Sequence, residues 1–173
     1  RILILGGTGM LGHTLWQQYN DRHDTVVTVR RDFASIANYG IFDPEHTIEH
    51  VEAQNFDSVL RAIDTVQPDA VVNCIGIIKQ SPLAKDRYVS ILINSLFPHQ
   101  LARVCQERRI RLVHISTDCV FSGREKRSRR DAENVQRSTL NAQRSISLNL
   151  YTEDDPSDAL DDYGKTKYLG EVD

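Results

Sequence analysis

The chain has few cysteines and no long hydrophobic run, and both absences restrict what it can be. Its three cysteines, Cys74, Cys105 and Cys119, are odd in number and too widely spaced for a zinc site or a disulfide framework. They indicate a reducing, cytoplasmic environment. No apolar stretch has the length of a membrane span, and the apolar start is too short for a signal peptide, so no membrane partner is expected.

The balance of charge argues against a nucleic-acid partner. The 173 residues carry a formal net charge of −3, with 40% hydrophobic and 26% charged residues. These values are typical of one soluble globular domain with a core of its own. Because no basic face dominates, no nucleic-acid partner is expected. The chain begins at Arg1 rather than at a methionine, which suggests a trimmed or incomplete N-terminus.

The first twelve residues predict a site for a pyrophosphate. Four apolar residues, Ile2 to Leu5, form a short buried strand and are followed by Gly6, Gly9 and Gly12. A helix is expected from His13 to Tyr19. In this order of elements, backbone N–H groups and the helix dipole can hold an anion. Glycines also mark ordinary turns, but the flanking strand and helix favour a nucleotide site.

Alternating strands and helices predict an α/β domain with a Rossmann-type, doubly wound parallel sheet. Further strands are expected at residues 25–29, near 48–53, at 70–75 and at 111–116, and helices at 56–66 and 88–109. Asn55 is expected to cap the first of these helices, and Pro98 to kink the second.

Arg30 and Arg31 follow the second expected strand, where this fold places the adenosine ribose of a dinucleotide. An arginine there favours the 2′-phosphate of NADP(H), whereas an acidic residue would favour NAD. The expected cofactor is therefore NADPH in preference to NAD. The alternative is that the two arginines only solvate a loop.

The stretch His46-Thr47-Ile48-Glu49-His50 matches a zinc-protease pattern. That chemistry needs both histidines on one face of a long helix, and Pro44 and an expected strand argue against such a helix here. We interpret the spacing as chance and expect no metal site.

The segment 124–149 interrupts the alternation of strands and helices. It contains seven Lys or Arg and three Asp or Glu, and it has no glycine, proline or aromatic residue. This composition predicts a flexible basic insertion or an unstable helix. Because no aromatic residues lie among the positive charges, binding of nucleic acid by this segment is disfavoured.

Three side chains in the second half of the chain suggest proton transfer. Thr117 ends the last expected strand at the carboxyl edge of the sheet, where open α/β sheets bind ligands. Tyr163 and Lys167 are four residues apart and would share a helix face. A nearby ammonium stabilises the phenolate form of a tyrosine, so Tyr163 could exchange a proton with a substrate oxygen that Thr117 holds. A lone Y-x-x-x-K pattern is more often a solvated helix face, but together with the nucleotide turn it favours catalysis.

Five stretches together resemble the extended short-chain dehydrogenase/reductases, closest to the dTDP-4-dehydrorhamnose reductase group. They are residues 6–12, 72–76, 114–123, 151–155 and 163–171. The resemblance implies an oxidoreductase that uses NADPH to reduce the 4-keto group of a deoxy sugar nucleotide, for the synthesis of surface-polysaccharide precursors.

The resemblance also implies roles for individual residues. The catalytic residues would be Thr117, Tyr163 and Lys167, with Asn94 supporting the active site through the long helix. The implied cofactor-binding residues are Gly6, Thr8, Gly9, Met10, Leu11, Gly12, Arg30, Arg31, Glu52, Cys74, Gly76, Asn94, Tyr163 and Lys167.

The chain departs from the family pattern at several places. Cys119 stands where the family usually has tyrosine, and Glu52 where an aspartate near the adenine is common. The segment 124–149 resembles an insertion. The chain stops at Asp173, before the C-terminal portion that binds the sugar nucleotide in the family. We therefore expect a truncated NAD(P)-binding Rossmann domain over residues 1–173, which by itself binds cofactor weakly and does not turn over a sugar nucleotide.

Two other functions are compatible with the same residues. An NAD-dependent sugar-nucleotide epimerase or dehydratase of this superfamily keeps Tyr163 and Lys167, although Arg30 argues against tightly held NAD. A non-catalytic regulatory subunit is the other, because the methionine adenosyltransferase beta subunit resembles the same reductases. Lys79 could approach a phosphate or face solvent, and solvent is favoured. The sequence identifies neither the sugar, nor the nucleotide, nor whether homo-oligomers form.

Overall fold

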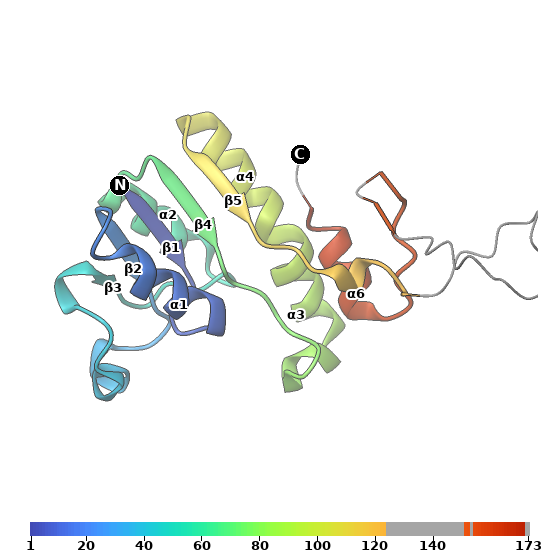
Figure 1. Cartoon of the computed structure of the whole chain (residues 1–173), viewed down its shortest axis with the longest axis horizontal. Helices are drawn as coiled ribbons and strands as arrows, with labels where there is room; N and C mark the ends of the chain where they lie inside the picture. Colours follow the sequence, from blue (N-terminus) through green and yellow to red (C-terminus); the bar gives the residue numbers. More distant parts are fainter. Residues whose placement is uncertain (124–150, 153, 172–173) are drawn as a thin grey trace, which may run out of the picture.

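The computed structural model describes residues 1–123, 151–152 and 154–171, so the segment expected to be an insertion, 124–149, lies outside the described residues. A five-stranded parallel sheet in the order β3-β2-β1-β4-β5 forms the centre (Figure 1). Its strands are β1 (Ile2–Leu5), β2 (Thr25–Thr28), β3 (Thr47–Ile48), β4 (Ala70–Asn73) and β5 (Arg111–His114). The predicted doubly wound parallel sheet is confirmed.

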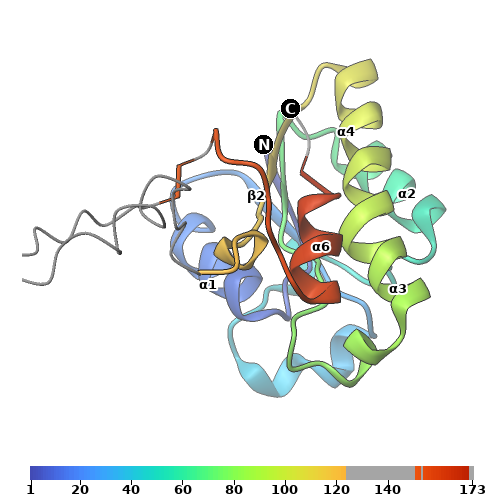
Figure 2. The same cartoon turned by 90° about the vertical axis from the view of Figure 1, so that its right-hand side faces the viewer.

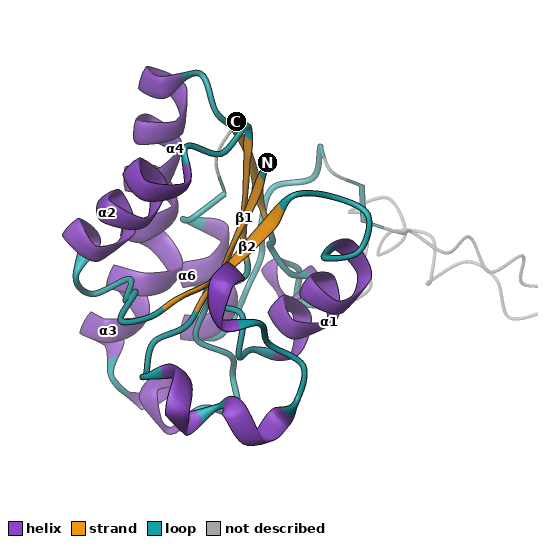
Figure 3. Ribbon diagram, turned by 90° about the vertical axis from the view of Figure 1, so that its left-hand side faces the viewer, coloured by secondary structure: helices purple, strands orange, loops and turns teal. Residues whose placement is uncertain are grey.

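Helices cover both faces of this sheet (Figure 3). The α-helices are α1 (Met10–Tyr19), α2 (Phe56–Val66), α3 (Arg87–Ile91), α4 (Phe97–Arg108) and α6 (Asp162–Tyr168). Short 3₁₀ turns occur at Phe33–Ser35, Ala37–Tyr39, Pro44–His46, Pro82–Lys85 and Asp118–Val120. Helix α1 packs on one face and α2 and α4 on the other, with α6 beside α3 and α4 (Figure 2).

Side chains of the central strand point alternately to the two faces, as the pleat of a strand requires. Leu3 and Leu5 join the core formed with α2 and α4, whereas Ile4 packs with Trp16 of α1 on the opposite face. The side chains of Leu3, Ile4 and Leu5 have no exposed surface. A strand that is buried on both faces needs a continuous apolar run, and this explains the start of the sequence.

The long helix predicted at 88–109 is divided by a π turn, Leu92–Leu96, which connects α3 to α4. The kink was expected at Pro98, but this residue lies in the first turn of α4, after the change of winding. Pro98 has no N–H, so it cannot donate the α-helical hydrogen bond to the Asn94 carbonyl, and the helix is wound more widely before it. The irregularity brings Asn94 into the candidate site described below.

Four predicted strands are shorter in the structure, and β2 ends at Thr28, one residue before the expected Val29. The strand expected near 48–53 ends at Ile48, because His50 adopts a left-handed backbone with φ of 58°. Strand β4 ends at Asn73, whose side chain accepts a hydrogen bond from Ile75 N (3.0 Å) and turns the chain away from the sheet. Strand β5 likewise ends at His114, before the expected Ser116.

Two helix starts also differ from the prediction. Helix α1 begins at Met10 instead of His13, directly after the glycine turn. Asn55 occupies the N-cap position of α2, but its side chain makes no capping hydrogen bond. The hydroxyl of Ser58 instead donates to the Asn55 carbonyl (2.6 Å) and receives a hydrogen bond from Glu52 N (2.9 Å).

The two histidines of the zinc-protease pattern do not share a helix. His46 ends a 3₁₀ turn, and His50 follows β3. His46 Nδ1 lies 2.8 Å from Asp43, whereas His50 Nε2 lies 3.0 Å from Asp32. The histidines therefore face different carboxylates.

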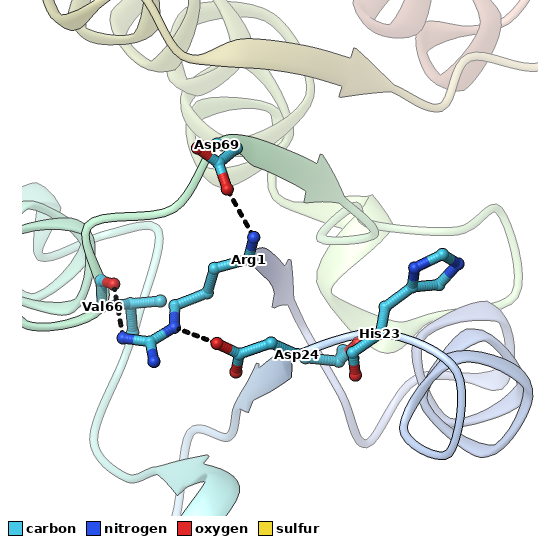
Figure 4. Close-up of polar contacts among 6 residues, drawn as sticks. Arg1, His23, Asp24, Val66 and Asp69 are labelled. Atoms are coloured by element: carbon cyan, nitrogen blue, oxygen red, sulfur yellow. Dashed lines mark hydrogen bonds and ion pairs between the residues drawn. The ribbon is translucent and has the colours of Figure 1, made fainter.

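Contacts of Arg1 hold the amino edge of the sheet together (Figure 4). Its guanidinium lies 2.7 Å from an Asp24 carboxylate oxygen and donates to the Val66 carbonyl (3.2 Å). Its amino group lies 2.5 Å from Asp69. These contacts join the starts of β1, β2 and β4 at the edge opposite the candidate site.

The residues on either side of segment 124–150 contact each other. The Asp158 carboxylate accepts hydrogen bonds from Ser122 N and Oγ, both at 2.7 Å, and from the Tyr151 hydroxyl at 2.8 Å. The ring of Phe121 stacks on that of Tyr151 with centroids 4.6 Å apart. The hydrogen bonds from Ser122 and Tyr151 lower the pKa of Asp158. We call this set of contacts the Asp158 clasp.

We predict that Arg109→Gly stabilises the protein. Arg109 ends α4 with φ of 58° and ψ of 36°, a left-handed conformation that costs a residue with a Cβ about 1 kcal/mol and glycine almost nothing. Urea unfolding should show a gain of about 0.5–1 kcal/mol. Gln106→Gly, at an exposed position inside α4, is the matched control and should destabilise by about 1 kcal/mol. A loss of stability in Arg109→Gly would contradict the assignment.

Candidate active site

The glycine turn after β1 combines a left-handed residue with a close backbone approach. Gly6 has φ of 83°, and its N–H donates to Thr28 Oγ1 (3.2 Å), which anchors the turn on β2. A Cβ on Gly12 would lie 2.2 Å from the Gly6 carbonyl oxygen. Only glycine therefore lets α1 start this close to the end of β1.

The start of α1 is free of competing groups. Gly9 at the N-cap has no side chain to bond the first-turn N–H groups, and the first turn carries no acidic residue. Thr8 and Gly9 are exposed, as are the side chains of Met10 and Leu11. An exposed helix N-terminus with unbonded N–H groups attracts an anion, so the described geometry fits the predicted pyrophosphate site.

The residues predicted to contact the adenosine lie along the neighbouring strand ends. Arg30 and Arg31 are exposed just after β2, which pairs with β1 in the register Ile4↔Val27. Glu52 is half-buried between β3 and α2. The pairing of β1 with β2 places both arginines at the same edge of the sheet as the glycine turn.

The turn after β4 connects the glycine turn to the second half of the site. A Cβ on Gly6 would lie 3.3 Å from the carbonyl carbon of Cys74, so the two turns touch. A Cβ on Gly76 would lie 3.4 Å from Lys167 Nζ and 3.5 Å from Asn94 Oδ1. Gly76 therefore lies between the predicted cofactor turn and the predicted catalytic lysine.

Lys167 is buried, with 6% of its surface exposed. Its Nζ donates to the Ile115 carbonyl oxygen (2.9 Å), just beyond β5. Burial lowers the pKa of Lys167, while the nearby Glu171 carboxylate acts in the opposite direction. Tyr163, one turn earlier on α6, is half-buried. The predicted Y-x-x-x-K pair is thus on one helix, and its lysine is not part of a solvated face.

Asn94 holds this helix to the turn after β4. Its Oδ1 accepts a hydrogen bond from Ile77 N (2.8 Å), and its Nδ2 donates to Ile77 O (3.1 Å) and to Thr166 Oγ1 (3.4 Å). A Cβ on Gly170 would lie 1.8 Å from the Asn94 carbonyl oxygen, so the turn after α6 and the π turn meet backbone to backbone. Asn94 therefore links the turn after β4 to α6 from a buried position.

Thr117 caps the 3₁₀ turn that lies against the start of α6. Its Oγ1 accepts a hydrogen bond from Cys119 N (3.3 Å) and donates to Asp118 Oδ1 (3.4 Å). A Cβ on Gly164 would lie 2.2 Å from the Cys119 carbonyl oxygen. This approach brings the turn that carries Thr117 next to the residue that follows Tyr163.

Ion pairs that no sequence pattern indicates join the loop after β4 to α6. Lys79 faces solvent, as predicted, with 60% of its side chain exposed, and it also lies 2.5 Å from Asp161, the residue that caps α6. Arg87 lies 2.7 Å from Asp162. A cavity of about 380 Å³ lies between this loop and Tyr163. Lys79, Arg87 and the pair Asp161 and Asp162 are visible in the sequence. No local sequence pattern indicates that residues so far apart form ion pairs.

The described part of the chain contains no helix that is both long and apolar enough to cross a bilayer.

Comparison with protein families identifies one match. A family model described as RmlD substrate binding domain matches residues 1–173. Among curated proteins, the chain is 29% identical over 171 residues to a dTDP-4-keto-6-deoxy-D-glucose reductase of Streptomyces niveus, covering 99% of this chain and 46% of that protein. It is 36% identical over 128 residues to a dTDP-4-dehydrorhamnose reductase of Mycobacterium tuberculosis, covering 71% of this chain and 34% of that protein. The chain therefore spans about half or less of the length of these relatives.

Solved structures share the fold. A dTDP-4-dehydrorhamnose reductase of Bacillus anthracis, in complex with NADP, has a TM-score of 0.64 at 22% identity, over 98% of this chain and 47% of that one. The Bordetella bronchiseptica enzyme WbmG, in complex with NAD and UDP, has a TM-score of 0.66 at 19% identity, over 98% and 47%. The expected resemblance to the reductases is confirmed at the level of family and fold.

We predict that only Cys119 reacts quickly with a disulfide reagent near neutral pH. Burial raises the pKa of the Cys74 and Cys105 thiols to about 11, so few of them are thiolates, whereas Cys119 is exposed. Spectrophotometric titration should show one fast thiol in the native protein and three in denaturant. The fast phase should vanish in Cys119→Ser, and its survival would contradict the prediction.

Proposed function

Because the chain belongs to the RmlD substrate binding domain family, we propose that it is the NADPH-binding and catalytic part of a cytoplasmic sugar-nucleotide ketoreductase. The proposed reaction reduces the 4-keto group of a dTDP-linked deoxy sugar, in the synthesis of surface-polysaccharide precursors. The observation that carries the proposal is the buried Lys167 ammonium behind Gly76, at the sheet edge where an uncapped helix start follows the glycine turn.

The described residues fit a nicotinamide dinucleotide. A Cβ on Gly7 would lie 2.1 Å from Val27 Cγ2, and one on Gly12 would fill the space beside Gly6, so both positions require the absence of a side chain. Gly6, Gly9 and the first turn of α1 would hold the pyrophosphate. Arg30 and Arg31 would hold the 2′-phosphate that distinguishes NADP from NAD.

When bound, the cofactor supplies a hydride. Tyr163 Oη would donate a proton to the oxygen of the reduced carbonyl, and Thr117 Oγ1 would hydrogen-bond to that oxygen and orient it. The Lys167 ammonium would stabilise the phenolate that proton donation leaves on Tyr163. Its burial strengthens this effect, because a charge acts more strongly where water is excluded.

The substrate class is supported by the relatives. Proteins that align with nearly all of the chain at 29% identity, or with most of it at 36%, are named as reductases of dTDP-linked keto sugars. The cavity beside Tyr163 is lined by charged side chains of both signs, Lys79 and Lys85 together with Asp161 and Asp162.

We predict that Arg30→Glu weakens NADPH binding by about tenfold or more, because a charge-assisted hydrogen bond to the 2′-phosphate is lost and a repulsion replaces it. Binding of NADH should change little. Fluorescence titration with both cofactors measures the effect. Arg22→Glu makes the same charge change at the amino end of β2, far from the glycine turn, and should leave both affinities unchanged. An equal effect of Arg30→Glu on NADPH and NADH would contradict the role of Arg30.

We predict that Tyr163→Phe lowers kcat at least about a hundredfold, the usual contribution of a positioned proton donor, and changes the affinity for NADPH much less. The assay follows NADPH oxidation by the protein at its natural length with a dTDP-4-keto-6-deoxy sugar. Tyr168→Phe removes a hydroxyl from an exposed position on the same helix and serves as the control. Turnover that survives in Tyr163→Phe would remove Tyr163 from the mechanism.

A further inference from the structure

Asn73 is a buried polar side chain at the end of β4, with 1% of its surface exposed. Its Oδ1 accepts a hydrogen bond from Ile75 N at 3.0 Å. An amide N–H can only donate, so the oxygen of the Asn73 amide must face Ile75 and the NH₂ group must face the other way. There it lies 3.0 Å from His114 Nδ1, on the adjacent residue of β5.

This contact determines the protonation of His114. A ring nitrogen that faces an NH₂ donor must offer its lone pair, so Nδ1 carries no proton and the neutral ring holds its hydrogen on Nε2. His114 Nε2 is buried and has no hydrogen-bond partner among the described residues. Burial, with smaller contributions from Lys167 and His99, lowers the pKa of His114 to about 4.

The hydrogen-bonded pair of Asn73 and His114 also positions the residues on both sides of the Lys167 ammonium. On one side, Ile115 directly follows His114, and its carbonyl accepts the hydrogen bond from Lys167 Nζ (2.9 Å). On the other side, Asn73 accepts the hydrogen bond from Ile75 N, and the next residue is Gly76. A Cβ on Gly76 would contact the same Lys167 Nζ. The side-chain amide of Asn73 thus holds the ends of β4 and β5 in place beside Lys167.

The charged groups around His114 come from two helices and the residues that follow α6. Helix α4 contributes His99 and Arg103 to the 810 Å³ cavity that His114 lines. Lys167 of α6 is not in that lining, but its charge acts on His114. Glu171 is the carboxylate lining that cavity, and it accepts a hydrogen bond from the Ser116 hydroxyl (2.5 Å). A proton on His114 would therefore add a second positive charge beside Lys167, and it would break the bond from Asn73.

We propose that His114 is a positioning residue for Lys167: held as the neutral Nε2–H tautomer by Asn73, it fixes the Ile115 carbonyl that orients the ammonium, without placing a competing charge beside it. The part that concerns catalysis rests on the proposed function. The tautomer and the orientation of Lys167 do not.

The first experiment measures the tautomer directly in this chain. Nitrogen-15 NMR of the imidazole rings, with the signals of His114 assigned by their loss in His114→Asn, should show a proton on Nε2 and a lone pair on Nδ1. The ring should stay neutral at pH values near about 6.5, where an imidazole in water gains its proton. A proton on Nδ1, or a ring that becomes charged near that pH, overturns the proposal.

The second experiment separates positioning from folding. In His114→Asn, the side-chain oxygen can take the place of Nδ1 and accept from Asn73, whereas the longer side chain of His114→Gln places its acceptor near the position of Nε2. In the protein at its natural length, His114→Gln should lose about tenfold or more in kcat with an unchanged KM for NADPH, because a displaced catalytic group costs rate rather than cofactor binding. His114→Asn should restore most of the loss.

Equal kcat values in the two variants, or a loss in His114→Gln that appears only in KM, overturn the positioning role. If the wild-type protein does not reduce any keto sugar nucleotide, the proposed function fails. The NMR result still decides whether Asn73 holds His114 as the neutral tautomer.

Discussion

Main-chain atoms of helix α6 and of the turn that follows it touch main-chain atoms of two other segments, and the whole candidate site depends on these close approaches. Gly164 faces the Cys119 carbonyl and Gly170 faces the Asn94 carbonyl, each at a spacing that a single Cβ would abolish. Contacts between backbones leave no side-chain rotamers to adjust, so the orientation of the helix is fixed by excluded volume and by hydrogen bonds. Lys167 lies between the two glycines in the sequence, so the same contacts fix the position of its backbone.

The burial of Lys167 is a cost that the surrounding structure offsets. A buried ammonium is destabilising unless it is hydrogen-bonded, and the carbonyl of Ile115 supplies that bond. The neighbouring side chains also contribute, because His114 is neutral and the amide of Asn94 is engaged by Ile77. The Lys167 ammonium lies behind Gly76, beside the amide oxygen of Asn94. A charge in such surroundings acts on the neighbouring tyrosine more strongly than it would in water.

The parts of this fold that the sequence predicts are local ones. A run such as Ile2 to Leu5 predicts a buried strand because four apolar residues in a row suit a strand covered on both faces. The glycine turn and the four-residue spacing of Tyr163 and Lys167 are likewise read within one turn of chain. The left-handed His50 could not be predicted, because histidine has no strong preference for that conformation, and neither could the π turn before Pro98. Two contacts connect positions far apart in the sequence: Lys79 with Asp161, 82 residues apart, and Asn73 with His114, 41 residues apart. No local sequence pattern predicts either contact.

The Asp158 clasp has a consequence for how the chain can vary. Ser122 and Asp158, 36 residues apart, close a loop whose ends are fixed beside the start of α6. The entropy of closing a loop grows only with the logarithm of its length, so doubling the intervening segment costs only about 0.6 kcal/mol. Because the Asp158 clasp holds the two ends of this segment together, its length can change while Thr117 and Tyr163 keep their positions. An insertion at this point is therefore expected to change the free energy of folding only a little.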